Sequence, residues 1–117
     1  MISVPIVTQT DDFSCAECCL KSILQHYGVK KNYKISSPID GANPRSLEFV
    51  LRKENFNVVS GNLGIKLIRY ITGKKIPVIV CYDGHYSIVT GFQNTKIIMM
   101  DPLFDQYQYL NFHQKLV

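Results

Sequence analysis

Three strand-length apolar runs, joined by short turns, constrain the fold of this 117-residue chain more than any other feature. The run 77–82 is followed by Asp83-Gly84, a dipeptide typical of two-residue hairpin turns, and then by the return run 85–92. A second turn, Gln93-Asn94-Thr95, leads into the run 96–100. Because such short turns join neighbouring antiparallel strands, the three runs predict an antiparallel meander.

The N-terminal part has the spacing of helices. Residues 2–8 predict a short strand or an extended arm. Apolar positions three and four residues apart then predict a helix over 15–27. Asp12 or Ser14 can cap the start of this helix, and Gly28 can end it.

Between this helix and the meander, Asn43-Pro44 predicts the start of a second helix that ends at Asn55 or Asn57. Residues 56–60 suit a short strand, and a third helix is expected after them, with Asn62 as its cap and Gly73 at its end. A fourth strand is expected over 106–110. Helices followed by an antiparallel sheet predict an α+β fold, and the length predicts one domain over 1–117.

Composition excludes several classes of protein. The net charge of +4 is mild and the basic residues form no dense stripe with interleaved aromatic residues, so we expect no nucleic-acid partner. No apolar run approaches the roughly 18 residues that a membrane span needs, and the N-terminus lacks the pattern of a signal peptide. The four cysteines include the adjacent Cys18 and Cys19, and nothing marks secretion. We therefore expect reduced thiols and a cytoplasmic location.

Cys15 is the candidate nucleophile because it opens the first helix. The backbone N–H groups and the positive dipole end at a helix start both favour the thiolate, which is the nucleophilic form. A buried structural thiol is the alternative for any cysteine. Cys18, Cys19 and Cys81 fit that alternative better, since Cys19 lies on the apolar face of the helix and Cys81 lies inside a strand.

His85 is the candidate general base among the three histidines. His26 lies eleven residues after Cys15 on the same helix, which at 1.5 Å per residue is roughly 16 Å away. His113 has no acid after it that could orient its ring. His85 starts a strand directly after a tight turn, where a side chain can reach a neighbouring element.

Asp101 is the candidate for orienting that base. If residues 92–94 form a three-residue loop, His85 faces Asp101 on the same side of the sheet, with Cβ atoms about 4.5–5.5 Å apart. A two-residue loop would set Asp101 opposite Tyr86 and on the wrong face. Its alternative role is that of a turn residue before Pro102.

Gln9 completes the candidate site. An acyl-transfer reaction develops an oxyanion, which a side-chain amide and the backbone N–H of the nucleophile can stabilise. Gln9 lies six residues before Cys15, which lets an extended segment fold back beside the helix start. A cysteine followed far downstream by a histidine and an acid is typical of papain-like enzymes.

The residues leave other functions open. The same site could pass an acyl group to an amine, as a transferase or amidase does. The domain could also bind peptides without cleaving them. Finally, Cys15-Ala16-Glu17-Cys18 has the spacing of a zinc or redox motif, with only Cys81, His85 and the other histidines as further ligands.

The segment 4–28, together with 77–92 and Met99-Met100-Asp101-Pro102, resembles the bacteriocin-processing peptidases that remove double-glycine leaders. The resemblance implies a papain-like cysteine peptidase fold, with N-terminal helices packed on the C-terminal sheet. It implies Cys15 as nucleophile, His85 as general base and then acid, Asp101 as its orienting group and Gln9 in the oxyanion hole. It implies no cofactor and no metal.

The resemblance also indicates the partners. Such enzymes cut a leader peptide after two small residues, usually Gly-Gly, so we expect a peptide or protein substrate. No membrane segment follows the domain, so we expect a separately encoded exporter. The family usually has Gly where this chain has Ala16, and Glu17 and Cys18 also differ from its usual small residues. These differences bear on the substrate more than on the mechanism.

Overall fold

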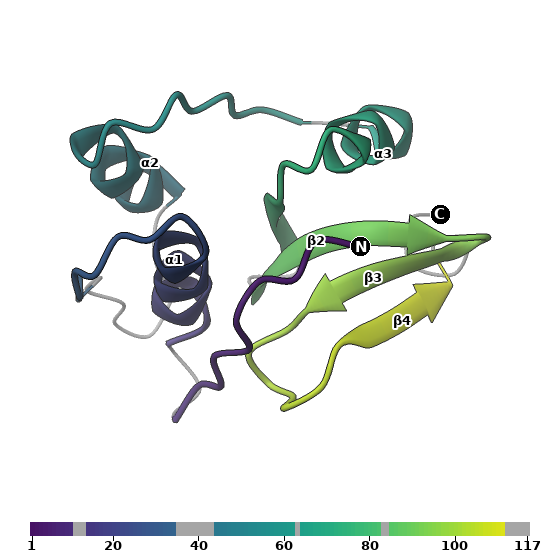
Figure 1. The fold of residues 1–117 in the computed structure, drawn as a ribbon, viewed down its shortest axis with the longest axis horizontal. Helices are drawn as coiled ribbons and strands as arrows, with labels where there is room; N and C mark the ends of the chain where they lie inside the picture. Colours follow the sequence, from purple (N-terminus) through teal and green to yellow (C-terminus); the bar gives the residue numbers. More distant parts are fainter. Residues whose placement is uncertain (11–13, 35–43, 63, 83–84, 112–117) are drawn as a thin grey trace.

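The computed structural model describes residues 1–10, 14–34, 44–62, 64–82 and 85–111. Within these residues three helices precede four strands: α1 (Cys15–His26), α2 (Pro44–Lys53), α3 (Ile65–Gly73), β1 (Val78–Tyr82), β2 (His85–Gln93), β3 (Lys96–Met100) and β4 (Gln108–Asn111). The strands form one sheet in the order β1-β2-β3-β4, and each strand pairs antiparallel with its neighbour (Figure 1). The α+β class and the antiparallel meander are confirmed.

Two apolar clusters cover the two faces of the sheet, because side chains alternate along β2. Ile88 turns toward α1, whereas its neighbour Val89 turns toward α3. The α1 cluster consists of Ile2, Val4, Cys15, Ala16, Cys19, Leu20, Ile23, Leu24, Leu47, Val50, Tyr86, Ile88 and Met100. The α3 cluster consists of Val89, Ile97 and Met99, with Ile65, Ile68, Val78, Val80, Phe92 and Leu110 partly buried against them.

The ends of α1 and α2 follow the sequence prediction. Gly28 has a φ of +79° after α1, and the N–H of Val29 donates to the carbonyl of Leu24 at 2.8 Å. This is a Schellman ending, which requires a left-handed residue at that position. Asn55, with a φ of +70°, has the same position after α2. At the start of α1, Ser14 is the cap residue, but its side chain makes no capping hydrogen bond. Asp12 lies outside the described residues.

The N-terminal arm, residues 1–10, runs between α1 and the sheet (Figure 1). It contains no strand, so the alternative of an extended arm is the correct one. The hydroxyl of Ser22 on α1 donates to the carbonyl of Pro5 at 2.6 Å. From the other side, the Tyr107 hydroxyl donates to the carbonyl of Val4. The arm is therefore fastened to both of its neighbours by hydrogen bonds to its own backbone.

The strand expected over 56–60 is wrong, since these residues form no strand. They follow α2 as an irregular connection, and the side chain of Val59 is 85% exposed. The carbonyl of Val58 accepts a hydrogen bond from the Arg52 guanidinium at 2.8 Å, whereas a strand would need a backbone partner. Of the helices that the described residues form, none has the length and apolar character needed to cross a bilayer.

Candidate active site

His85 and Asp101 form the centre of the candidate site. His85 is the first residue of β2, and Asp101 directly follows the last residue of β3. The Nε2 atom of His85 lies 2.6 Å from Oδ1 of Asp101, a hydrogen-bond distance typical of an imidazole held by a carboxylate. The carboxylate side chain is 9% exposed and the imidazole 21% exposed, so solvent screens the contact only weakly. The predicted meeting of these side chains is confirmed.

The register of β2 and β3 that produces this contact differs from the predicted one. Gln93 pairs with Lys96, so the turn consists of Asn94 and Thr95 and is not the expected three-residue loop over 92–94. Asn94 has a φ of +56°, a conformation that asparagine tolerates in tight turns. Farther along the two strands, the ladder shifts by one residue between Val89 and Gly91.

This shift is a β-bulge, and it decides which face Asp101 occupies. Counting from the turn alone would set Asp101 opposite Ile88, on the face away from His85. Beyond the bulge Ile88 instead pairs with Met100, so the next position sets Asp101 opposite Ser87. Ser87 and His85 are two residues apart on one strand and share a face. Asp101 therefore reaches His85 diagonally, and the expected direct pairing of the two is wrong.

Thr90 is the extra residue in the bulge, and both its hydroxyl and its carbonyl form hydrogen bonds. Its side chain is fully buried, and its hydroxyl donates to the carbonyl of Ile98 at 3.2 Å. The backbone carbonyl of Thr90 accepts the N–H of Ile2 at 2.9 Å. The N-terminal arm therefore provides a hydrogen-bond partner for a carbonyl that the bulge excludes from the ladder between β2 and β3. The sequence carries no clear signal for this bulge, because Thr is common in regular strands.

The loop after Asp101 ties Gln9 to the site. Oδ1 of Asp101 accepts the N–H of Leu103 at 3.0 Å, and the backbone carbonyl of Asp101 accepts the N–H of Phe104 at 2.9 Å. The alternative role of Asp101 as a turn residue is thus also correct. The carbonyl of Pro102 accepts the backbone N–H of Gln9 at 2.8 Å. The structure therefore brings Gln9 next to the residue that follows Asp101, and the side-chain oxygen of Gln9 is buried.

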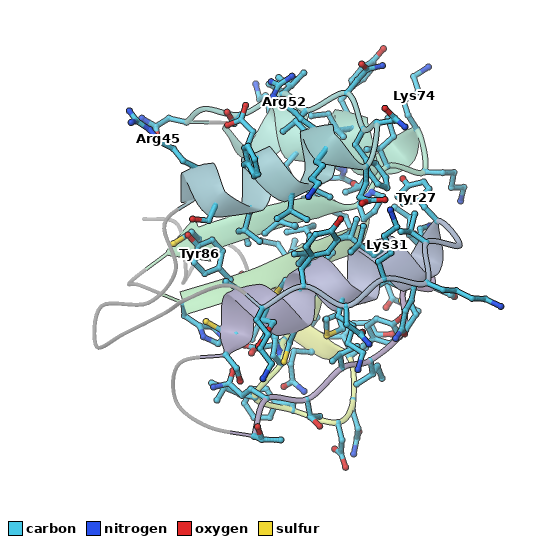
Figure 2. All side chains as sticks on the ribbon, turned by 90° about the vertical axis from the view of Figure 1, so that its left-hand side faces the viewer. Tyr27, Lys31, Arg45, Arg52, Lys74 and Tyr86 are labelled. Carbon is cyan, nitrogen blue, oxygen red and sulfur yellow. The ribbon has the colours of Figure 1, made fainter. Side chains whose placement is uncertain are left out.

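Cys15 is the first residue of α1, as predicted, and it is 4% exposed. It belongs to the α1 cluster together with Tyr86, the residue that follows His85. Figure 2 views the molecule from the side of α1 and α2, and it shows Tyr86 on the part of the sheet that these helices cover. The start of α1 and the start of β2 therefore lie close together. No hydrogen bond joins the Cys15 thiol to His85 among the described residues.

The other cysteines differ from Cys15 in their surroundings. Burial raises the pKa of the Cys18 thiol, and it raises the pKa of the Cys19 thiol farther. Both therefore stay protonated at neutral pH and fit the structural role that was expected for them. Cys81 does not fit that role, because its side chain is exposed on β1, an edge strand of the sheet. All four cysteines are free thiols.

The proposed metal ligands do not come together. Among the described residues, no three side chains of His, Cys, Asp or Glu are grouped as a metal site requires. The carboxylate nearest to His85 already holds its ring through Nε2. His113 lies outside the described residues. The arrangement of His85 and Asp101 instead suits proton transfer, because an Nε2–H donated to the carboxylate leaves the lone pair on Nδ1.

A comparison with family models decides the family. The model of the peptidase C39 family matches residues 3–112, which include all four candidate residues. The chain belongs to the peptidase C39 family. It is therefore a cysteine peptidase of the bacteriocin-processing group that the sequence resembles.

A solved structure has the same fold as this peptidase. The peptidase domain of Streptococcus ComA, a bifunctional ABC transporter involved in a quorum-sensing pathway, matches with a TM-score of 0.75 and 23% sequence identity. The match covers 96% of this chain and 89% of the ComA domain. At this identity the likeness shows the fold, which confirms the papain-like architecture. No curated protein matches the sequence.

Proposed function

We propose that this peptidase hydrolyses peptide bonds through Cys15, His85 and Asp101, with Gln9 in the oxyanion hole. The observation that carries the proposal is the 2.6 Å contact between His85 Nε2 and Asp101 Oδ1, at the end of the sheet where α1 begins. This contact fixes the ring so that Nδ1 can accept a proton from the thiol of Cys15. The family supplies the class of reaction, and the geometry supports these four residues as the ones that perform it.

The reaction follows the general course of thiol peptidases. His85 takes the proton of Cys15, and the thiolate attacks the carbonyl carbon of the scissile bond. The negative charge on the carbonyl oxygen is stabilised by the Gln9 side-chain amide and the backbone N–H of Cys15. His85 then protonates the leaving amine, and an acyl-enzyme forms. Water activated by His85 releases the acyl group, while Asp101 keeps the imidazole in one orientation throughout.

The substrate we propose is a leader peptide that is cut after two small residues, with Gly-Gly as the first choice. Cys15 is almost fully buried beside Ala16, and Tyr86 lies in the same cluster. A substrate backbone without large side chains fits such an enclosed thiol best. The peptidase domain of ComA belongs to a transporter that is described as bifunctional. By analogy we propose that the released peptide passes to an exporter, and that cleavage occurs in the cytoplasm.

The test is hydrolysis of a synthetic peptide that contains a Gly-Gly junction, followed by mass spectrometry. Cys15→Ala should abolish cleavage, whereas Cys18→Ala, which removes a thiol one turn away on the same helix, should retain it. Replacement of Gly-Gly by Leu-Leu in the peptide should prevent cleavage by the wild-type protein. Equal activity of the two cysteine variants would refute the assignment of the nucleophile.

The alternative functions are further outcomes of the same experiment. A peptide that binds equally to wild type and Cys15→Ala, but is never cut, would identify a catalytically silent binding domain. Formation of a peptide hydroxamate in the presence of hydroxylamine, at a rate well above that of hydrolysis, would identify an acyltransferase, whereas release of ammonia from a primary amide would identify an amidase. Trapping of the acyl-enzyme on Cys15 by rapid acid quench would support the peptidase and the transferase, and it would exclude silent binding.

A further inference from the structure

The positive charge of the protein is concentrated on one segment. Residues 55–82 contain four basic residues, Lys66, Arg69, Lys74 and Lys75, and no Asp or Glu. The chain has 13 basic and 9 acidic residues in total, so outside this segment the two signs balance. The net charge of +4 is therefore the charge of α3 and its flanking turns.

Two basic residues outside this segment are neutralised by ion pairs, in contrast to those of α3. Lys31 forms an ion pair with Glu54 at 3.2 Å, and Arg52 forms one with Glu48 at 2.8 Å. No ion pair of a residue on α3 occurs among the described residues. Figure 2 shows Lys74 at the outer edge of the molecule. The charge on α3 is thus open to an external anion.

Large apolar side chains lie exposed between these cations. Leu67 is 46% exposed, Tyr70 63% and Ile76 50%. They do not belong to the α3 cluster. The helix contributes Ile65 and Ile68 to that cluster from its opposite side. Packing of the sheet therefore does not explain their apolar character. We call these three residues, together with Lys66, Arg69, Lys74 and Lys75, the α3 face.

One cation and one ring are in contact on this face, because Lys74 Nζ lies 5.4 Å from the ring centre of Tyr70. At the border of the face, the Arg69 guanidinium lies 5.5 Å from the ring centre of Phe92, which belongs to the α3 cluster. A convex helix that carries aromatic and aliphatic side chains among cations matches the boundary of an anionic bilayer. There the apolar groups enter the headgroup region and the cations approach the phosphates.

We propose that the α3 face docks the protein on a membrane surface that contains anionic phospholipid. The docking is peripheral, with Leu67 and Tyr70 at the headgroup boundary. The proposal does not rest on the peptidase mechanism, since none of the candidate catalytic residues belongs to the face. It would hold the site near a bilayer, where a substrate bound for export must arrive.

The test is cosedimentation of the full chain with vesicles of phosphatidylcholine alone or mixed with phosphatidylglycerol. We expect binding to the mixed vesicles only, with an affinity that falls as sodium chloride is added. Each basic residue near an anionic surface contributes a factor of roughly five, so Lys66→Gln with Lys74→Gln should weaken binding about 25-fold. The matched control, Lys30→Gln with Lys34→Gln, removes the same charge from exposed positions outside the face and should bind like wild type.

A second variant tests the apolar part of the face. Leu67→Ser with Tyr70→Ser should weaken binding to the mixed vesicles without changing its dependence on salt. Both residues are exposed, so circular dichroism should show unchanged melting. Failure of the wild type to bind mixed vesicles at low salt would overturn the proposal. Equal losses of vesicle binding in the Lys66/Lys74 variant and in the Lys30/Lys34 control would also overturn it. Retention on immobilised polyglutamate without vesicle binding would also overturn it, in favour of an acidic protein partner.

Discussion

The two halves of the candidate site are positioned by different kinds of interaction. The sheet half, His85 and Asp101, is placed by the ladder between β2 and β3 and by the bulge at Thr90. The helix half, Cys15 and Gln9, is placed by the packing of α1 and by the N-terminal arm. In the arm, single hydrogen bonds to backbone carbonyls replace a continuous ladder.

This difference teaches how each half should respond to change. A ladder has a period of two, so a slip of one residue moves a side chain to the other face and removes the contact altogether. The arm has no such period, and the loss of one hydrogen bond only widens the range of positions that Gln9 samples. We therefore expect all-or-none effects in the sheet half and graded effects in the helix half.

The largest expected effect is that of Asp101→Asn in the sheet half. The neutral amide removes the negative charge beside the imidazole and can turn its NH₂ toward Nε2, which imposes the wrong tautomer on the ring. By analogy with triads of the same logic, kcat/KM should fall about 10³- to 10⁴-fold. Peptide hydrolysis measures the effect, and Asp105→Asn, an exposed change in the same loop, is the control. A loss of less than tenfold would contradict the role given to the carboxylate.

Thr90→Val tests the bulge that sets the face of Asp101. The change removes the buried hydrogen bond to Ile98 but keeps the shape of the side chain. Unfolding in urea should show a loss of roughly 1 kcal/mol or somewhat more, and kcat/KM should fall with it. Thr90→Ser keeps the hydroxyl and should retain the activity. If Thr90→Val and Thr90→Ser were equally active, the hydroxyl would have no part in holding the register.

Tyr107→Phe tests the arm, and we expect a smaller effect on activity. The change removes the hydrogen bond to the Val4 carbonyl, so Gln9 should be held less firmly. Stability should fall by about 0.5–1.5 kcal/mol, and kcat/KM by a factor of a few. Tyr109→Phe, on an exposed ring of β4, should have neither effect. A loss as large as that of Asp101→Asn would show that the two halves do not differ in the way described.

The smallest expected effect is a pH dependence of the stability, which arises from the buried thiol of Cys19 on α1. Burial raises the pKa of Cys19 above its ordinary value of 9.0, so above pH 9 the unfolded chain loses this proton while the folded chain keeps it. Stability is therefore complete below that pH and falls as the pH rises, by at most about 1.4 kcal/mol per pH unit. Melting curves from pH 8 upward measure this slope, which Cys19→Ala should flatten. Cys81→Ala, which removes an exposed thiol, should leave the slope unchanged.

Much of the fold could be predicted from local patterns. The apolar spacing of α1, the left-handed residues Gly28 and Asn55 and the strand-length runs all act over a few residues. Local patterns do not say whether a strand finds a partner. Residues 56–60 have the composition of a strand, but they pair with no strand among the residues that the structure describes. This is why that prediction was wrong.

The candidate site shows the same limit more sharply. The residue types and their order were sufficient to select His85 and Asp101, and these two side chains do meet. They meet because two departures from the predicted register offset each other. The two-residue turn alone would place Asp101 on the face away from His85, and the one-residue bulge returns Asp101 to the face of His85. The bulge depends on the N–H of Ile2, about ninety residues away in sequence, so no local pattern reports it. The contact of Gln9 with Pro102 is equally remote.

The central claim is that Cys15, His85 and Asp101 act as one unit, and the alkylation rate of Cys15 tests it most directly. Iodoacetamide labelling of each cysteine is followed by mass spectrometry at neutral pH, in wild type and in His85→Ala. The account predicts that Cys15 reacts much faster than Cys18 and Cys19, and that it loses this advantage without His85. Equal rates of Cys15 labelling in the two proteins would show that the imidazole does not activate the thiol, and would contradict the account.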